Sequence, residues 1–159
     1  MRPISLKKLF TVLISAVIIL PAVSYCLITV ANNRIADKIE AELIEYPLPE
    51  NTALVDSVSV AGKLVGSGNG MQYMGAILIE SRLTEEELRD YYCSDLDHVE
   101  VRKQKTAKID FINSGDYSFS GFFDDDGKTY YSISCWDAKR SETYGDFIAC
   151  LLDLDIRAH

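Results

Sequence analysis

Hydrophobic positions follow three different spacings along the chain, and each spacing predicts a different kind of element. The first is an unbroken apolar run over residues 9–31, from Leu9 to Ala31, which contains no charged side chain. A helix of about 20 apolar residues crosses the hydrocarbon core of a bilayer. The run therefore predicts a transmembrane helix with the lipid bilayer as its partner, and a helix in lipid tolerates Pro21.

Charges before the run indicate which of its ends faces the cytoplasm. Arg2, Lys7 and Lys8 precede it. Cytoplasmic flanks of membrane spans are enriched in Lys and Arg. We therefore expect residues 1–8 in the cytoplasm and the chain beyond the span on the extracytoplasmic side of the cell membrane, although Arg34 and Lys38 just beyond the run partly offset this bias.

A cleaved signal peptide is the alternative to a retained anchor. Its apolar region is typically only about 7–15 residues long, and small residues precede its cleavage site. Thr29-Val30-Ala31 fits that requirement poorly, and the bulky Tyr25 before Cys26 disfavours a lipoprotein. We favour an uncleaved signal anchor and keep cleavage as the alternative.

The second spacing is helical and covers residues 32–50. Ile35, Ile39 and Leu43 are four residues apart, and charged residues fill most of the other positions. This pattern predicts a helical stalk that continues the membrane helix and stops at Pro47.

The third spacing is an alternation of period two, which is typical of strands. The second predicted strand is apolar on both faces and is expected at the centre of a sheet, whereas the third has a polar face and is expected at an edge. The predicted strands are one between residues 52 and 64, and then 71–79, 98–105, 117–123 and 129–136.

One short helix is predicted between the second and third strands. Thr84 and Glu87 form a capping box, and Leu83 and Leu88 form a hydrophobic staple around it. The acidic residues that follow Thr84 favour the positive end of the helix dipole. We expect this helix over residues 85–94.

The elements together predict an α+β domain over residues 51–159, with the order β-β-α-β-β-β-β. About five or six antiparallel strands pack with one short helix. Residues 146–156 are ambiguous between strand and helix. Ile148, Leu152 and Leu154 favour a sixth strand there.

Net charge restricts the partners. The chain has 16 basic and 24 acidic residues, and the part after the apolar run carries a net charge of −11. Phosphate backbones repel a domain that acidic. We therefore expect no nucleic-acid partner, and we consider another envelope protein instead.

No residue pattern reaches the level of a catalytic, cofactor or metal site. The glycine-rich residues 66–70 are expected to form a hairpin turn, because a strand follows them where a phosphate-binding loop needs a helix. Residues 124–127 resemble a calcium loop only in their aspartates. His98 lies beside Asp95 and Asp97, which does not suffice for a catalytic assignment. No cofactor is expected.

Two groups of residues remain as candidate features. Cys135 and Cys150 lie on predicted strands that are possible neighbours, so a disulfide is geometrically allowed, although buried thiols are slightly preferred. The domain has one basic cluster, which fits either a charged sheet edge or a docking patch for an acidic partner. Its members are Arg102, Lys103, Lys105 and Lys108.

These observations favour a membrane-anchored envelope protein whose acidic domain is a binding or interaction module. A membrane-tethered enzyme, or an accessory subunit of one, is the first alternative. A pilin-like structural subunit is the second, since an apolar helix running into a sheet is the pilin layout. The apolar run lacks an acidic residue near its start and a preceding glycine for processing, and both absences argue against a pilin.

Overall fold

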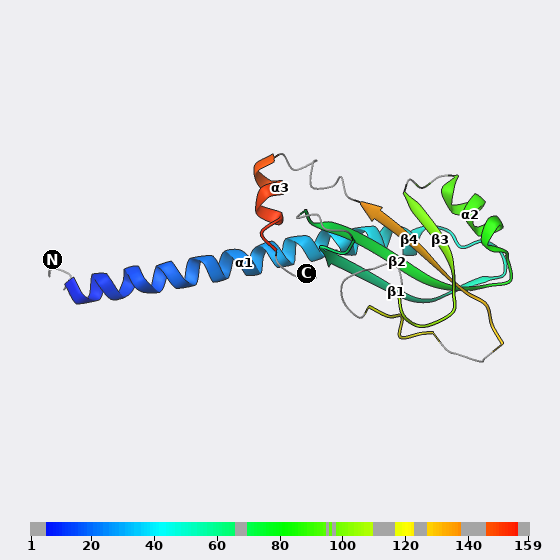
Figure 1. The fold of residues 1–159 in the computed structure, drawn as a ribbon, viewed down its shortest axis with the longest axis horizontal. Helices are drawn as coiled ribbons and strands as arrows, with labels where there is room; N and C mark the ends of the chain where they lie inside the picture. Colours follow the sequence, from blue (N-terminus) through cyan, green and yellow to red (C-terminus); the bar gives the residue numbers. More distant parts are fainter. Residues whose placement is uncertain are drawn as a thin grey trace.

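A computed structural model describes residues 6–65, 70–94, 96, 98–109, 117–122, 127–137 and 146–155. Its long helix α1 runs far beyond the rest of the molecule at the N-terminal end (Figure 1). The α+β class is confirmed, because this helix is followed by a small antiparallel sheet and short helices. The elements are α1 (Leu6–Glu45), β1 (Thr52–Gly62), β2 (Gln72–Ser81), α2 (Glu85–Cys93), β3 (Val99–Gln104), β4 (Tyr130–Asp137) and α3 (Asp146–Leu152).

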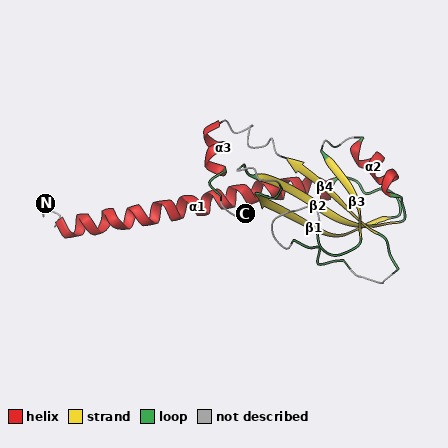
Figure 2. Cartoon of the chain, in the orientation of Figure 1, coloured by secondary structure: helices red, strands yellow, loops and turns green. Residues whose placement is uncertain are grey.

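The sheet has the strand order β1-β2-β4-β3, and all of its neighbouring strands are antiparallel. The hairpin of β1 and β2, the central position of β2 and the edge position of β3 are all as predicted. The turn predicted within this hairpin falls largely on residues 66–69, which lie outside the described residues. The strands lie side by side along the C-terminal half of α1 (Figure 2).

The prediction of five or six strands is wrong for the described part of the chain, where four strands form the sheet. The predicted strand over residues 117–123 is described as far as residue 122. It makes one isolated bridge, between Ser118 and Lys108. At this bridge the N–H of Ile109 donates to the carbonyl oxygen of Tyr117 (2.9 Å), and the N–H of Phe119 donates to that of Ala107 (2.8 Å).

This segment instead covers one face of the sheet. Phe119 and Ile109 are buried there against residues of β1 and β2, such as Val60 and Leu78. Aromatic residues alternate with serines from Tyr117 to Ser120, and Tyr117 and Phe119 pack on the apolar surface of the sheet. The alternation resembles that of a strand for this reason.

Asp56 ties the covering segment to β1. Its carboxylate accepts hydrogen bonds from the N–H of Gly121 (3.0 Å), the hydroxyl of Ser120 (2.9 Å) and the N–H of Ser57 (2.9 Å). Burial raises the pKa of this carboxyl group, but the donors, led by Gly121, outweigh burial and hold the pKa below the ordinary value of 3.8.

We expect Asp56→Asn to lower the free energy of unfolding by about 1 kcal/mol at neutral pH, because a charged acceptor is lost. A depressed pKa in the folded state stabilises the fold above the unfolded-state pKa, and this stabilisation is lost as pH falls through the folded-state pKa. The difference between wild type and variant should be full above about pH 5 and shrink below about pH 4. Urea unfolding, followed by fluorescence of the single tryptophan, Trp136, measures it. A difference that stays constant down to about pH 3 would contradict the assignment.

The opposite face of the sheet is covered by α1 and α2. Ile35, Ala36, Ile39 and Leu43 of α1 are buried against this face. The predicted helix beyond Ala31 is therefore present, but it is a layer of the folded domain where a separate stalk was expected. Its four-residue spacing arises from contact with the sheet.

Gly75 of β2 lies directly beneath α1. A Cβ atom at this position would be 2.3 Å from the backbone N of Glu40 and 2.7 Å from the carbonyl C of Ile39. Real side-chain carbons do not approach backbone so closely, so glycine is what allows α1 to lie this near to the sheet.

Gly75→Ala is therefore expected to push α1 off the sheet and to lower the free energy of unfolding by about 2 kcal/mol, the cost of overpacking. Gly70→Ala is the matched control, since its added Cβ would have Asp153 Oδ1 at 3.9 Å as its nearest contact. Urea unfolding of the full chain in detergent micelles compares the two. Equal stabilities of the two variants would show that the close approach is not required.

Helix α2 confirms the predicted capping box. The Thr84 hydroxyl accepts a hydrogen bond from the N–H of Glu87 (3.3 Å), and the Glu87 carboxylate accepts one from the N–H of Thr84 (2.8 Å). Leu88 and Tyr92 of α2 are buried against the sheet. The pKa of Tyr92 is raised to about 12, mainly because burial disfavours the charged phenolate and to a smaller extent because Tyr91 and Tyr46 lie nearby.

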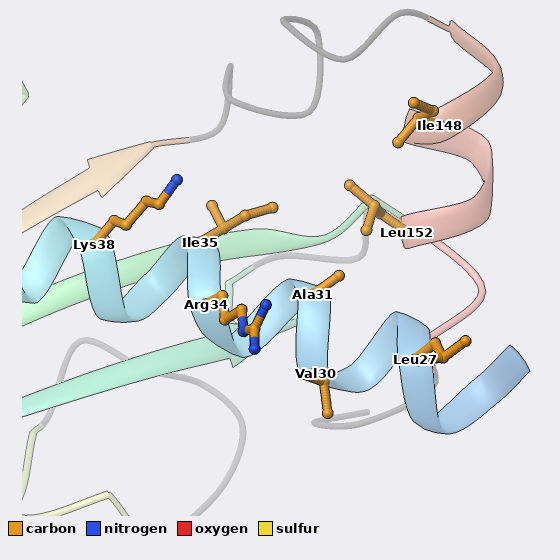
Figure 3. Close-up of a pocket in the computed structure, with 8 residues that line it drawn as sticks. All are labelled: Leu27, Val30, Ala31, Arg34, Ile35, Lys38, Ile148 and Leu152. Atoms are coloured by element: carbon orange, nitrogen blue, oxygen red, sulfur yellow. The ribbon is translucent and has the colours of Figure 1, made fainter. Parts of the chain in front are cut away.

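The preference for a strand over residues 146–156 is wrong, because α3 is a helix over Asp146–Leu152. Ile148 and Leu152 are four residues apart and project from α3 toward α1 (Figure 3). A four-residue separation fits one face of a helix as well as one face of a strand, and contact with α1 selects the helix.

Candidate functional site

A pocket of about 490 Å³ lies where α3 meets α1. Helix α3 stands crosswise beside α1 (Figure 1), and Figure 3 draws the side chains of both helices that line the pocket. The lining residues are Leu27, Val30, Ala31, Arg34, Ile35, Lys38, Ile148 and Leu152.

A buried polar group fixes α3 in this position. The Asn32 amide nitrogen donates to the carbonyl oxygen of Leu152 (3.1 Å) and to the carboxylate of Asp155 (3.0 Å). The Tyr73 hydroxyl of β2 donates to the Asn32 amide oxygen (2.8 Å). Asn32, Tyr73 and Asp155 are all inaccessible to solvent. Buried polar groups need such partners, so this network specifies where the C-terminal end of α3 lies.

A second contact supports the same arrangement from the sheet. The N–H of Met71, just before β2, donates to the carboxylate of Asp153 (2.7 Å). Leu152 is buried beside Met71 and Ile35 in the same cluster. The pocket wall formed by α3 is thus held by polar and apolar contacts together.

The lining combines an apolar surface with two cations. Arg34 and Lys38 are four residues apart on α1, so they project from the same side of the helix. Both are exposed, and neither forms a salt bridge with an acidic residue in the described part of the chain. The neighbouring Asp37 is engaged elsewhere, because its carboxylate accepts a hydrogen bond from the Ser59 hydroxyl (2.6 Å).

The residues of the pocket were not selected from the sequence. Arg34 and Lys38 were considered there only for their effect on membrane orientation. Their spacing with Leu27, Val30 and Ala31 on α1 was available as a signal. The other wall of the pocket, α3, was expected to be a strand, and a strand there would belong to the sheet and not to a contact with α1.

The predicted basic cluster is exposed but divided. Arg102 and Lys103 are neighbours on β3 and point to opposite faces of the sheet, and Arg102 forms a salt bridge with Glu100. Lys105 and Lys108 follow the end of the strand. The docking role of this cluster stays a prediction.

The cysteines are present as thiols, with Cys135 half-buried on β4 and Cys150 exposed on α3. The disulfide between them stays a prediction. Exposed His98 has a positive φ of 59°, and the adjacent Asp95 and Asp97 lie outside the described residues. Residues 124–126 of the calcium-like loop lie outside them as well. No cluster of three potential metal ligands occurs among the residues that the structure describes.

No protein-family model matches the chain, and no curated protein or solved structure matches it either.

Proposed function

We propose that the protein is a single-pass, membrane-anchored binding module of the cell envelope, whose folded domain is built directly onto its anchor. The observation that carries this proposal is the continuity of α1. One helix supplies both the apolar segment and a buried layer of the domain.

The exposure of α1 supports an anchor. Phe10–Glu45 is long and apolar enough to cross a membrane, and no part of its most apolar window is buried in the protein. The core helix of a soluble protein would be mostly buried, so that explanation fits poorly. Large apolar side chains such as Val17, Ile18 and Leu20 are more than 60% exposed, and transfer into lipid would remove this surface from water.

The continuity of α1 also favours a retained helix over a cleaved signal peptide. Cleavage after Ala31 would cut α1 immediately before Asn32 and remove Leu27 and Val30 from the pocket. The basic residues before the span favour a cytoplasmic N-terminus and a domain on the other side of the membrane.

Alkaline carbonate extraction tests the anchor. An integral protein stays in the membrane pellet, so we expect the full-length chain there, at the mass of the uncleaved sequence. Release of the chain into the supernatant, or a mass that lacks residues 1–31, would contradict the proposal. The orientation is tested by adding protease to cells whose outer layers are permeable but whose cytoplasmic membrane is sealed. We expect the domain to be digested, and full protection of the domain would contradict the proposed orientation.

The binding role rests on surface charge, because the acidic domain suits a basic surface on another envelope protein. Crosslinking in intact membranes, followed by mass spectrometry, is the corresponding experiment. We expect one reproducible partner crosslinked to the domain. Crosslinks confined to the span would argue against a binding role for the domain.

A further inference from the structure

The pocket between α1 and α3 lies at the end of the apolar run. Leu27, Val30 and Ala31 belong to the last turns of that run, and Arg34 and Lys38 follow it. A helix rises about 1.5 Å per residue, so Arg34 lies about 5 Å beyond Ala31, and Lys38 about 10 Å beyond it. Arg34 lies at the depth of the lipid phosphates, because the headgroup layer adds about 5–8 Å to each side of the hydrocarbon core. The long side chain of Lys38 can reach back to the same layer.

Helix α3 is oriented to meet the same layer. It lies crosswise to α1 (Figure 1), so an α1 that crosses the bilayer would place α3 along the bilayer surface. Ile148, Leu151 and Leu154 are exposed in this region. Apolar side chains on a helix that lies in the interface are stabilised by insertion at the headgroup boundary.

We propose that this pocket binds one anionic phospholipid of the surrounding bilayer, with the phosphate between Arg34 and Lys38. The first carbons of an acyl chain lie against Leu27, Val30 and Ile148. This inference rests on the proposed membrane anchor.

The charge distribution makes the site selective. The part of the chain after the span carries a net charge of −11, so most of its surface repels anionic lipid. Arg34 and Lys38 are an exception at the depth where the phosphates lie. In the described part of the chain, neither cation forms a salt bridge, and the carboxylates of Asp37 and Asp155 accept hydrogen bonds from Ser59 and Asn32.

The dimensions of the pocket also suit this ligand. Its volume of about 490 Å³ falls within the range of about 300–1,000 Å³ that is typical of small-molecule sites. Leu27 and Val30 of its lining belong to the run of exposed apolar residues on α1, so the remainder of each acyl chain can stay in the bilayer beside that run.

Native mass spectrometry of the full-length chain, released from nanodiscs, counts the lipids that remain bound. The nanodiscs contain phosphatidylcholine and phosphatidylglycerol in equal amounts. We expect one retained phosphatidylglycerol per wild-type chain. A cation near an anionic lipid surface contributes about fivefold in affinity. The variant Arg34→Gln with Lys38→Gln should therefore lose about 25-fold in affinity for the retained lipid.

The control variant, Arg82→Gln with Lys105→Gln, removes two exposed cations that lie far from the pocket. It should retain the lipid as wild type does. Equal loss in both variants, or equal retention of the two lipids by wild type, would overturn the proposal. In a second measurement, soluble dioctanoyl phosphatidylglycerol should raise the unfolding midpoint of wild type in detergent, whereas dioctanoyl phosphatidylcholine and inorganic phosphate should not. Stabilisation by inorganic phosphate alone would assign the site to a free anion.

The two proposals fail separately. A chain that carbonate releases from membranes contradicts the anchor. A chain that stays in the membrane pellet but shows no preference for the anionic lipid contradicts only the lipid site.

Discussion

A chain with Ile14→Arg and Ile18→Arg is expected to disappear from the carbonate-resistant membrane fraction. The two positions are four residues apart on one side of α1, with Ile18 near the middle of the apolar run and Ile14 nearer its start, and both side chains are exposed. An arginine at the centre of a span costs about 2.5–3.5 kcal/mol on insertion scales, and less toward the interface. The pair therefore costs about 5 kcal/mol, which offsets much of the contribution of the apolar residues.

The matched control places two arginines at exposed apolar positions outside the span. Leu48 follows α1 and Leu54 lies on β1, and both are about 40% exposed. Leu48→Arg with Leu54→Arg should leave the chain in the membrane pellet. Immunoblotting of pellet and supernatant after carbonate extraction compares the two variants. Retention of the variant with both span arginines would mean that the apolar run does not hold the protein in the membrane.

Elements with a strong local signal were predictable from the sequence. The capping box of Thr84 and Glu87 involves only neighbouring residues, so α2 is found where it was expected. The residues of β2 are apolar on both faces because both faces of the strand are covered. The capping box depends on residues three positions apart, and burial of both faces of β2 requires a continuous apolar segment. Both patterns are therefore visible in the sequence itself.

Elements whose form depends on a distant partner were not predictable. The segment 117–122 alternates like a strand, but it lies over the face of the sheet that contains Val60 and Leu78, and its one bridge is to Lys108. The spacing of Ile148 and Leu152 fits both a helix and a strand, and only their contact with α1 distinguishes the two. The pocket depends on both helices, so it could not be inferred before the position of α3 was known.

Asn32→Asp is expected to release α3 from α1 at neutral pH. The substitution replaces the amide nitrogen, which donates to Leu152 and Asp155, with an oxygen that only accepts. It also places a second carboxylate about 3 Å from that of Asp155, where no solvent reaches either group. An uncompensated buried charge costs about 3–5 kcal/mol. Hydrogen exchange of the full chain in nanodiscs should show loss of protection confined to residues 146–155.

The acid response of this variant separates electrostatic repulsion from a packing defect. One proton shared by two adjacent carboxyl groups restores a hydrogen bond between them, because like charges raise the pKa of one member of the pair. Protection of α3 in Asn32→Asp should therefore recover as pH falls toward about 4. Asn32→Leu has no such proton to gain, so it should stay unprotected over the same range. Tyr73→Phe removes only one hydrogen bond to Asn32 and should cost about 1 kcal/mol.

Recovery in both Asn32 variants, or in neither, would show that the amide does not position α3 through its donors. Recovery in Asn32→Asp alone would have a further consequence for the pocket. Ile148 and Leu152 form one of its walls, so docking of α3 and retention of the anionic lipid should return together as the pH is lowered. A polar residue just beyond the apolar run would then determine whether the protein presents a lipid site at the membrane surface.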